Sequence, residues 1–182
     1  MNSKEFKTLI QVEVYGPYKE ARKKKRLNLL DKIWCRYVSP NANAVYLIRK
    51  MQRRYTQGKL GKLCAALIHT KLIRRYQITI PMDSVIGSGL TIPHPCSITI
   101  SSKSIGNNFR VYQNTTIGIK AHLTNPPVIG NNVVLFASSS VIGDITIADN
   151  TVIGANSVVV KSTVTNGVYA GCPARLLKER CE

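Results

Sequence analysis

Residues 128–159 read VIGNNVVLFASSSVIGDITIADNTVIGANSVV, and this stretch decides the fold. An aliphatic residue recurs every six positions, at Ile129, Leu135, Val141, Ile147, Ile153 and Val159. A period of six matches neither the 3.6-residue repeat of an α-helix nor the two-residue alternation of a half-buried strand. It fits a short flat strand followed by a corner, with three such units closing one triangular coil.

The spacing extends upstream from this stretch. Further aliphatic residues in the series are Ile80, Ile86, Ile92 and Ile98, then, after a one-residue slip, Ile105, Val111 and Ile117. Small side chains follow four residues later, at Ser84, Cys96, Ser102, Thr115, Ser139, Thr151, Ser157 and Thr163. A sandwich of alternating strands would not hold this register, so we predict a parallel β-helix of roughly four coils.

The register breaks once and the chain divides into three parts. Residues 119–127 lie between two good repeats, so we expect them to leave the coil as an excursion loop. Upstream, the apolar spacing predicts helices over residues 43–56 and 60–73, and the Gly16-Pro17 pair is expected to break the first segment. We expect a basic helical region at 1–78, the β-helix at 79–167 and a C-terminal tail at 168–182.

Positive charge is concentrated at one end of the chain. The net charge is +17; residues 1–78 carry 19 of the 26 Lys and Arg and four acids, which makes that segment +15. The basic run 19–26 directly precedes Leu27, Leu29, Leu30, Ile33 and Trp34. This order predicts contact with an anionic membrane surface. The alternative is that the apolar residues pack on the β-helix and the charges are solvated. No nucleic-acid motif occurs, so nucleic acid is not an expected partner.

Several features bound the location and chemistry. No apolar run reaches the ~18 residues of a membrane span, and the first residues lack the apolar core of a signal peptide. We therefore expect a cytoplasmic protein that reaches the inner face of the membrane through residues 1–78. The five cysteines form no C-x-x-C pair, which predicts buried free thiols and no metal site.

Four motifs carry a resemblance to a known family. They are Gly89-Leu-Thr-Ile-Pro-His94, Tyr112-Gln-Asn-Thr-Thr-Ile-Gly118, Ile153-Gly-Ala-Asn-Ser-Val-Val159 and Gly171-Cys-Pro-Ala-Arg175. Together they resemble the hexapeptide-repeat acyltransferases, and within them the serine acetyltransferase branch is the most similar. The resemblance implies a left-handed β-helix, acetyl-CoA as co-substrate, no metal, and a homotrimer.

His94 matches the family's catalytic histidine. The resemblance implies that it takes the proton from the acceptor hydroxyl while that hydroxyl attacks the thioester directly. Imidazole suits this role because it can accept a proton near neutral pH. From the residues alone, a structural histidine remains the alternative. His69 is expected to be structural or exposed.

The residues that would contact the acceptor depart from the serine enzymes. The resemblance places Ser39, Thr79, Pro93, His122 and Asn125 at acceptor-side positions. Thr79, Pro93, Thr124 and Asn125 stand where the serine enzymes carry acids, Arg and His. Because these positions lack the charges that a zwitterion needs, we expect a neutral hydroxyl acceptor, with a sugar or polysaccharide precursor as the main prediction.

The family also implies a CoA groove towards the C-terminal coils. By position, the close-approach residues are Gly118, Ala137, Ser138, Gly154 and Ala155, and the phosphate-binding residues are Lys161 and Arg175. Packing of the coils is the alternative explanation for the small residues.

Two other functions stay open at this point. One is a serine O-acetyltransferase with altered acceptor recognition. The other is no enzyme but a basic membrane- or nucleic-acid-binding β-helix scaffold. A carbonic anhydrase of this fold would need three metal-binding histidines from the β-helix, and His69 lies outside it.

Overall fold

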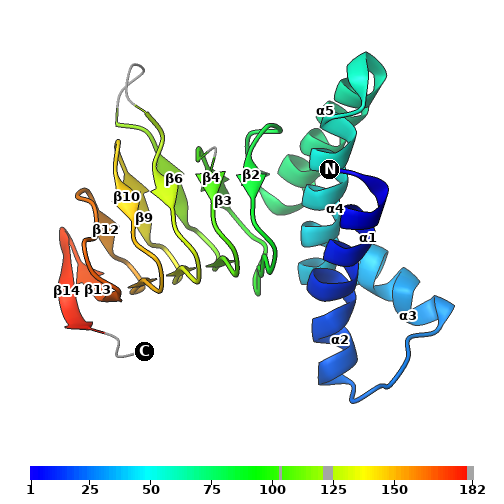
Figure 1. The fold of residues 1–182 in the computed structure, drawn as a ribbon, viewed down its shortest axis with the longest axis horizontal. Helices are drawn as coiled ribbons and strands as arrows, with labels where there is room; N and C mark the ends of the chain where they lie inside the picture. Colours follow the sequence, from blue (N-terminus) through cyan, green and yellow to red (C-terminus); the bar gives the residue numbers. More distant parts are fainter. Residues whose placement is uncertain (103, 121–124, 180–182) are drawn as a thin grey trace.

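The computed structural model describes residues 1–102, 104–120 and 125–179, which form a layer of helices capping one end of a parallel β-helix. Figure 1 shows the helices at one end of the long axis and the final hairpin, β13 (Gly167–Gly171) and β14 (Ala174–Glu179), at the other. The β-helix, predicted from the six-residue spacing, and the N-terminal helical extension, predicted from the apolar spacing upstream, are both confirmed. No helix in the described part of the chain is long and apolar enough to cross a membrane.

The helical layer contains two long helices and a chain of short ones. The order is α1 (Ser3–Leu9), a π-helical turn (Ile10–Tyr15), α2 (Gly16–Ala21), α3 (Leu29–Ile33), a second π-helical turn (Trp34–Val38), α4 (Pro40–Tyr55) and α5 (Gly58–Tyr76). The two predicted helices are confirmed as α4 and α5. The expected break at Gly16-Pro17 is wrong. Gly16 keeps a helical φ of −55°, and Pro17 lies in the first turn of α2, where its missing N–H removes no hydrogen bond.

Three sheets form the walls of the β-helix. Sheet 1 contains β1 (Ile78–Thr79), β3 (Ile98–Ile100), β6 (Thr116–Gly118), β9 (Ser140–Ile142) and β12 (Val158–Val159). Sheet 2 contains β2 (Val85–Ile86), β4 (Ser104–Ile105), β7 (Val128–Ile129) and β10 (Thr146–Ile147). Sheet 3 contains β5 (Arg110–Val111), β8 (Val134–Leu135), β11 (Val152–Ile153), β13 (Gly167–Gly171) and β14 (Ala174–Glu179). The five strands of sheet 1 correspond to about five coils, one more than expected.

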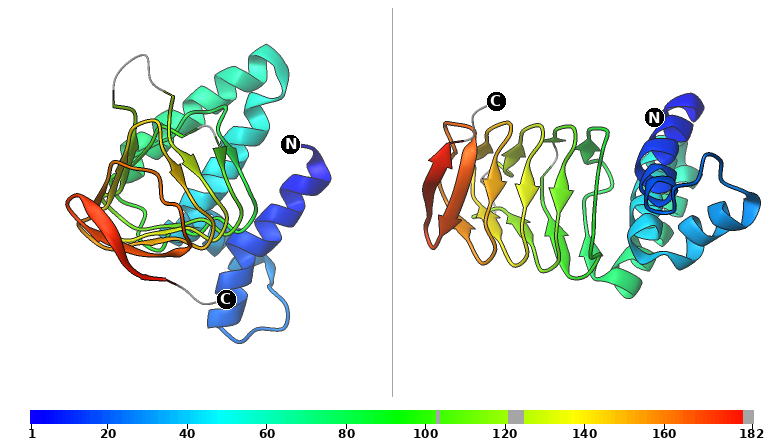
Figure 2. Two further views of the ribbon diagram at one scale, coloured as in Figure 1. Left: turned by 60° about the vertical axis from the view of Figure 1, so that its left-hand side comes forward. Right: turned by 90° about the horizontal axis from the view of Figure 1, so that it is seen from below.

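Strands in successive coils pair in parallel, and of the strands that the structure describes only β14 runs antiparallel, to β13. The aliphatic series fills the axis, since Ile117, Leu135 and Val141 are fully buried. Buried hydroxyls satisfy the backbone at the corners: Ser139 Oγ donates to the Phe136 carbonyl at 2.7 Å, and Thr115 Oγ1 to the Tyr112 carbonyl at 2.8 Å. The figures show the coils stacked along one axis (Figures 1 and 2).

The predicted register is wrong at one corner. Thr99 pairs with Thr116 and Ile100 with Ile117, so Ile100 rather than Ile98 belongs to the axial series. The bridge from Thr91 to Arg110 aligns the preceding coil, and the corner between Ile92 and Ile100 is two residues longer than its counterparts. Ile98 fills the small-residue position instead, which leaves Cys96 exposed rather than in the core.

The other cysteines divide the same way. Cys35 is buried, whereas Cys64 and Cys172 are exposed, so the expectation of buried thiols is wrong for most of the described cysteines. Cys64 lies on the outer side of α5, and Cys172 lies in the turn between β13 and β14.

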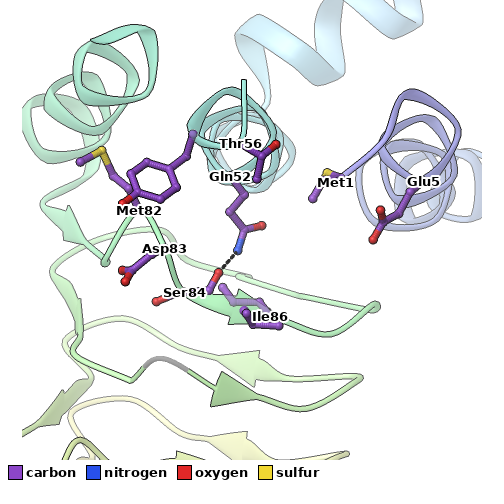
Figure 3. A pocket seen from close by; sticks show the side chains of 10 residues that line it. Met1, Glu5, Gln52, Thr56, Met82, Asp83, Ser84 and Ile86 are labelled. Atoms are coloured by element: carbon purple, nitrogen blue, oxygen red, sulfur yellow. Dashed lines mark hydrogen bonds between the residues drawn. The ribbon is translucent and has the colours of Figure 1, made fainter. Parts of the chain in front are cut away.

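Polar contacts join the helical layer to the first coil. Gln52 of α4 donates from Nε2 to the Ser84 carbonyl at 2.9 Å, the bond drawn in Figure 3. Arg49, one turn earlier, donates to the Ile86 carbonyl at 2.8 Å and forms an ion pair with Glu13. The first coil is therefore held by hydrogen bonds from α4 as well as by apolar packing.

Candidate active site

The corners between sheet 3 and sheet 1 stack into a continuous edge along the β-helix. Backbone N–H groups join one corner to the next: Asn114 to the Cys96 carbonyl at 3.1 Å, Ser138 to Gln113 at 3.0 Å, and Asn156 to Ala137 at 3.0 Å. We call residues 94–97, 112–114, 136–138 and 154–156 the corner ladder. Asn114, Ser138 and Asn156 have positive φ, which makes the turn into sheet 1.

His94 lies at the helical-layer end of the corner ladder. Its side chain is exposed, in the corner that is two residues longer than the others. Its ring centroid is 6.2 Å from that of Tyr112, and Tyr112 stacks on Phe136 with a centroid separation of 5.1 Å. Among the described residues, no hydrogen bond from a side chain reaches either ring nitrogen of His94, so the aromatic contact is what borders the imidazole.

Tyr112 and Phe136 were missed as site residues from the sequence. Each directly follows a core aliphatic residue, Val111 or Leu135, so both occupy the same position of the repeat. That shared position was the available signal, because side chains at one position of successive coils stack on each other.

A cavity of about 370 Å³ opens between the helical layer and the first coil, and Pro93, the residue before His94, lines it. It brings together two residues predicted on the acceptor side, Ser39 and Pro93. Its other polar lining includes Tyr18, Asn41 and Thr91. Helix α4 begins at Pro40 with Ser39 as its N-cap residue, and this start places Ser39 at the cavity. The cavity therefore adjoins the corner that carries His94, although His94 itself is not among its described lining residues.

Among the described residues that line this cavity, Glu13 is the only charged one, and both of its carboxylate oxygens are hydrogen-bonded. Its Oε1 accepts hydrogen bonds from the backbone N–H groups of Gly89 and Leu90 at 2.8 and 3.1 Å, and both oxygens bind Arg49. The carboxylate thus serves the fold and offers no free charge to a bound molecule.

The remaining acceptor-side residues are not brought to this cavity. Thr79 is exposed on β1, beside Thr99 of β3. Asn125 donates from Nδ2 to Asp144 Oδ2 at 3.0 Å. His122, like Thr124, lies outside the described residues. The structure therefore brings Ser39 and Pro93 together at this cavity, whereas Thr79 and Asn125 are not among its lining residues.

Five of the predicted CoA residues gather at one end of the corner ladder. Ala137, Ser138, Gly154 and Ala155 belong to the corner ladder itself. Arg175 of β14 pairs with Ala170, whose Cβ would be 3.0 Å from a Cβ placed on Gly154. The edge therefore runs from His94 at one end to an exposed guanidinium at the other.

Gly118 and Lys161 lie apart from these residues. Gly118 ends β6 and Lys161 follows β12, so both lie where sheet 1 leaves for the next corner, on the opposite edge of that sheet. A ligand that contacted both groups on one chain would have to cross the face of sheet 1.

A second cavity, of about 320 Å³, lies between α1, α4 and the turn before β2 (Figure 3). Met1, Gln52, Asp83 and Ser84 are among the residues that line it. None of the predicted site residues belongs to it, so it lies outside the candidate active site.

Comparison with known proteins identifies a family that is similar to this chain in sequence. The family described as "Bacterial transferase hexapeptide (six repeats)" matches residues 126–161. The serine acetyltransferase of Staphylococcus epidermidis is 36% identical over 125 residues, covering 66% of this chain and 59% of that protein. The chain belongs to the hexapeptide-repeat family of left-handed β-helix acyltransferases. Serine acetyltransferase 3, mitochondrial, of Arabidopsis thaliana is 32% identical over 126 residues, covering 68% of this chain and 32% of that relative.

Solved structures of the family share the fold over nearly the whole chain. The crystal structure of Neisseria gonorrhoeae serine acetyltransferase (CysE) superposes with a TM-score of 0.81 at 20% identity, covering 99% of this chain and 69% of that one. A serine acetyltransferase in complex with CoA gives a TM-score of 0.76 at 20% identity, covering 96% and 71%. The predicted left-handed β-helix with N-terminal helices is thereby confirmed. The chain spans 32% and 59% of the two relatives above.

Proposed function

We propose that this chain is an acetyl-CoA-dependent O-acetyltransferase in which His94 is the general base. The observation that carries the proposal is the place of His94, which is exposed at one end of the corner ladder and directly follows Pro93, a residue that lines the cavity with Ser39. The family's motifs around His94 and the relatives' names support the same activity.

The reaction is a direct transfer in a ternary complex. Neutral His94 accepts the proton of the acceptor hydroxyl while that oxygen attacks the thioester carbonyl carbon of acetyl-CoA. The C–S bond then breaks, and the imidazolium returns the proton to the departing CoA thiolate. An alcohol is a poor nucleophile at neutral pH, so a positioned base contributes about 10²–10⁴-fold to such a step.

We propose L-serine as the acceptor. The relatives reported above are both named serine acetyltransferases, and this fits the serine alternative better than the sugar acceptor that was our main prediction. The departures at Thr79 and Pro93 then mean that serine is bound by other groups than those of the serine enzymes. Ser39 and Asn41, which line the cavity, are candidates for hydrogen bonds to the amino acid.

A neutral hydroxyl, such as that of a sugar, is the second candidate acceptor. The observation that favours it is the engagement of Glu13, which leaves no free charged side chain among the residues that line the cavity. A zwitterion bound there would lack a counter-charge from this chain, whereas a sugar needs only hydrogen bonds.

Acceptor profiling tests the proposal and separates the two acceptors. Purified protein is given acetyl-CoA with L-serine, L-threonine or a panel of sugars, and released CoA is measured by mass spectrometry because a thiol reagent would react with the exposed cysteines. We expect CoA release and O-acetylserine with L-serine. Release with a sugar and none with serine would support the second candidate, and no acetyl transfer to any hydroxyl would refute the function.

We propose that acetyl-CoA lies along the corner ladder. The small side chains of Ala137, Ser138, Gly154 and Ala155 let the pantetheine arm approach the backbone, and the exposed Arg175 meets a phosphate. Gly118 and Lys161 would contact the same CoA from the other edge of sheet 1, or that of a neighbouring copy.

We also propose a homotrimer. In one chain the corner ladder is open on its outer side, with Ser138, Ala155 and Arg175 all exposed, so CoA would be held from one side only. A neighbouring copy supplies the second wall and could bring Gly118 and Lys161 to it. Light scattering should give three times the 20.2 kDa of the chain. A stable monomer with full activity would contradict the trimer.

A further inference from the structure

Helix α3 and the π-helical turn after it present their apolar side to solvent. Leu29 and Leu30 are 72% and 74% exposed, and Trp34 is 47% exposed. Together with Ile33, Tyr37 and Val38 they form what we call the apolar stripe. The six residues recur as adjacent pairs every four positions, so they occupy one face of a continuous helical segment.

The opposite face of this segment is held by the rest of the protein. Cys35 is fully buried, and Asp31 accepts hydrogen bonds from Lys24 Nζ at 2.6 Å and Tyr18 Oη at 3.3 Å. The Arg36 guanidinium lies over the rings of Tyr15 and Tyr46, at 5.5 and 5.4 Å from their centroids. The segment is thus fixed with its polar side inward, and the apolar stripe is exposed as a consequence.

This arrangement contradicts, for Leu29, Leu30, Ile33 and Trp34, the alternative in which the apolar residues pack inward; Leu27, in contrast, is partly buried against the core. Figures 1 and 2 both place α3 at the far side of the helical layer, away from the coils. Single exposed apolar residues are common on proteins, but contiguous exposed apolar patches mark interaction surfaces.

Exposed positive charge adjoins the apolar stripe. Lys23, Lys25 and Arg26 lie in the loop just before α3, all exposed and none in an ion pair within the described residues. Two of the four acids of residues 1–78 are already used, Glu13 by Arg49 and Asp31 by Lys24. The surface therefore combines apolar side chains with uncompensated positive charge.

We propose that the apolar stripe and these three basic residues dock on an anionic lipid bilayer. The headgroups would attract the basic loop, and the apolar stripe would enter the boundary between headgroups and acyl chains, with Trp34 at the interface. Helix α3 lies at the opposite end of the molecule from β13–β14, so the β-helix would point away from the membrane (Figure 1).

Charge favours the bilayer over a second copy of this chain. Two copies meeting at this face would bring two segments of +15 together, whereas an anionic surface neutralises each of them. Duplex nucleic acid would satisfy the basic residues but leave the apolar stripe in contact with water and phosphates. The bilayer is the one partner that matches both parts of the surface.

Trp34 makes the test direct because it is the only tryptophan in the chain. The full-length protein is mixed with vesicles of phosphatidylcholine and phosphatidylglycerol, or of phosphatidylcholine alone. We expect co-sedimentation and a blue shift of Trp34 emission with the anionic vesicles, both decreasing as salt rises. Unchanged emission and no co-sedimentation at low salt would overturn the proposal.

Variants assign the effect to this surface. The double variant Leu29→Ser/Leu30→Ser should lose vesicle binding, and each charge removed from Lys23, Lys25 or Arg26 should weaken it about fivefold. Val164→Ser/Leu177→Ser is the matched control, because it alters two exposed aliphatic side chains at the β13–β14 end of the molecule. This variant should bind vesicles normally. Circular dichroism checks that every variant is folded.

Two further results would indicate that the partner of this surface is not a bilayer. A blue shift that grows with protein concentration in the absence of lipid would mean that a second copy covers the apolar stripe. A shift produced by duplex DNA but not by anionic vesicles would mean that nucleic acid is the ligand. Either result would overturn the proposal.

Discussion

Arg49 and Glu13 form a two-pronged ion pair that lies entirely inside the protein. Arg49 Nη2 is 2.6 Å from Glu13 Oε1 and Arg49 Nε is 2.7 Å from Oε2, and neither side chain is exposed. The same pair joins α4 to the π-helical turn after α1 and, through Gly89 and Leu90, to the first coil. It therefore fixes the wall of the cavity that Ser39 and Pro93 line.

Breaking this pair should destabilise the protein strongly. Arg49→Met leaves the Glu13 carboxylate buried without its partner, which costs about 3–5 kcal/mol of unfolding free energy. The double variant Arg49→Met/Glu13→Gln should lose less than the two single variants combined, because no buried charge remains and the amide oxygen can still accept from Gly89. Urea unfolding measures these losses.

Lys24→Met is the matched control, since Lys24 pairs with Asp31 but is 40% exposed. Its loss of stability should be clearly smaller than that of Arg49→Met. Equal losses of unfolding free energy in the two variants would show that the buried Arg49–Glu13 pair contributes no more to stability than the Lys24–Asp31 pair.

His69 should make the stability depend on pH. Burial lowers the pKa of His69, and its Nε2 is buried without a hydrogen-bond partner in the described structure. The unfolded chain takes up this proton at its ordinary pKa of about 6.5, whereas the folded protein resists it. Stability should therefore be complete above that pKa and fall as the pH drops from it towards the folded pKa.

His69→Leu tests this assignment. Urea unfolding at about pH 7.5 and about pH 5.5 should show a smaller pH effect in the variant than in the parent protein. The lowered pKa values of Asp31 and Asp149, caused mainly by hydrogen bonds from Lys24 and from the Asn131 backbone, act at more acidic pH and do not enter this window. An identical pH effect in both proteins would contradict the role of His69.

If acetyl-CoA lies along the corner ladder, a larger side chain there should weaken acetyl-CoA binding without affecting the fold. Ala155 is exposed, so Ala155→Leu should fold normally but place a larger side chain in the path of the pantetheine arm. We expect the KM for acetyl-CoA to rise about tenfold or more, because overpacking by several methyl groups commonly costs 1–3 kcal/mol. Val85→Leu, at an exposed position of β2 in the first coil, is the control and should leave KM unchanged.

The six-residue spacing was sufficient to predict the β-helix, because only a repeated strand and corner keeps that period across so many residues. It was not sufficient at the corner of His94. Ile98 and Ile100 are both aliphatic and both buried, so the two extra residues of that corner leave the pattern of hydrophobic residues intact. Strand pairing reveals the insertion, and with it the exposure of Cys96 and the outward place of His94.

The contacts around the site could not be predicted from the sequence. Glu13 lies 76 residues before Gly89, to which it is bonded, and no local pattern links them. The apolar residues after the basic run left two directions open, contact with a membrane surface and packing on the β-helix, because an amphipathic helix usually turns its apolar side inward. The burial of Asp31 and Cys35 decides the direction, and it is a property of the tertiary structure.

The most direct test of the account is turnover by His94 variants with acetyl-CoA and the best acceptor from the profiling experiment. His94→Ala and the size-matched His94→Gln should keep the fold and the affinity for acetyl-CoA but lose about 10²–10⁴-fold in kcat, while His69→Leu keeps its activity. Near-normal turnover by a folded His94 variant would contradict the assignment of His94 as the general base.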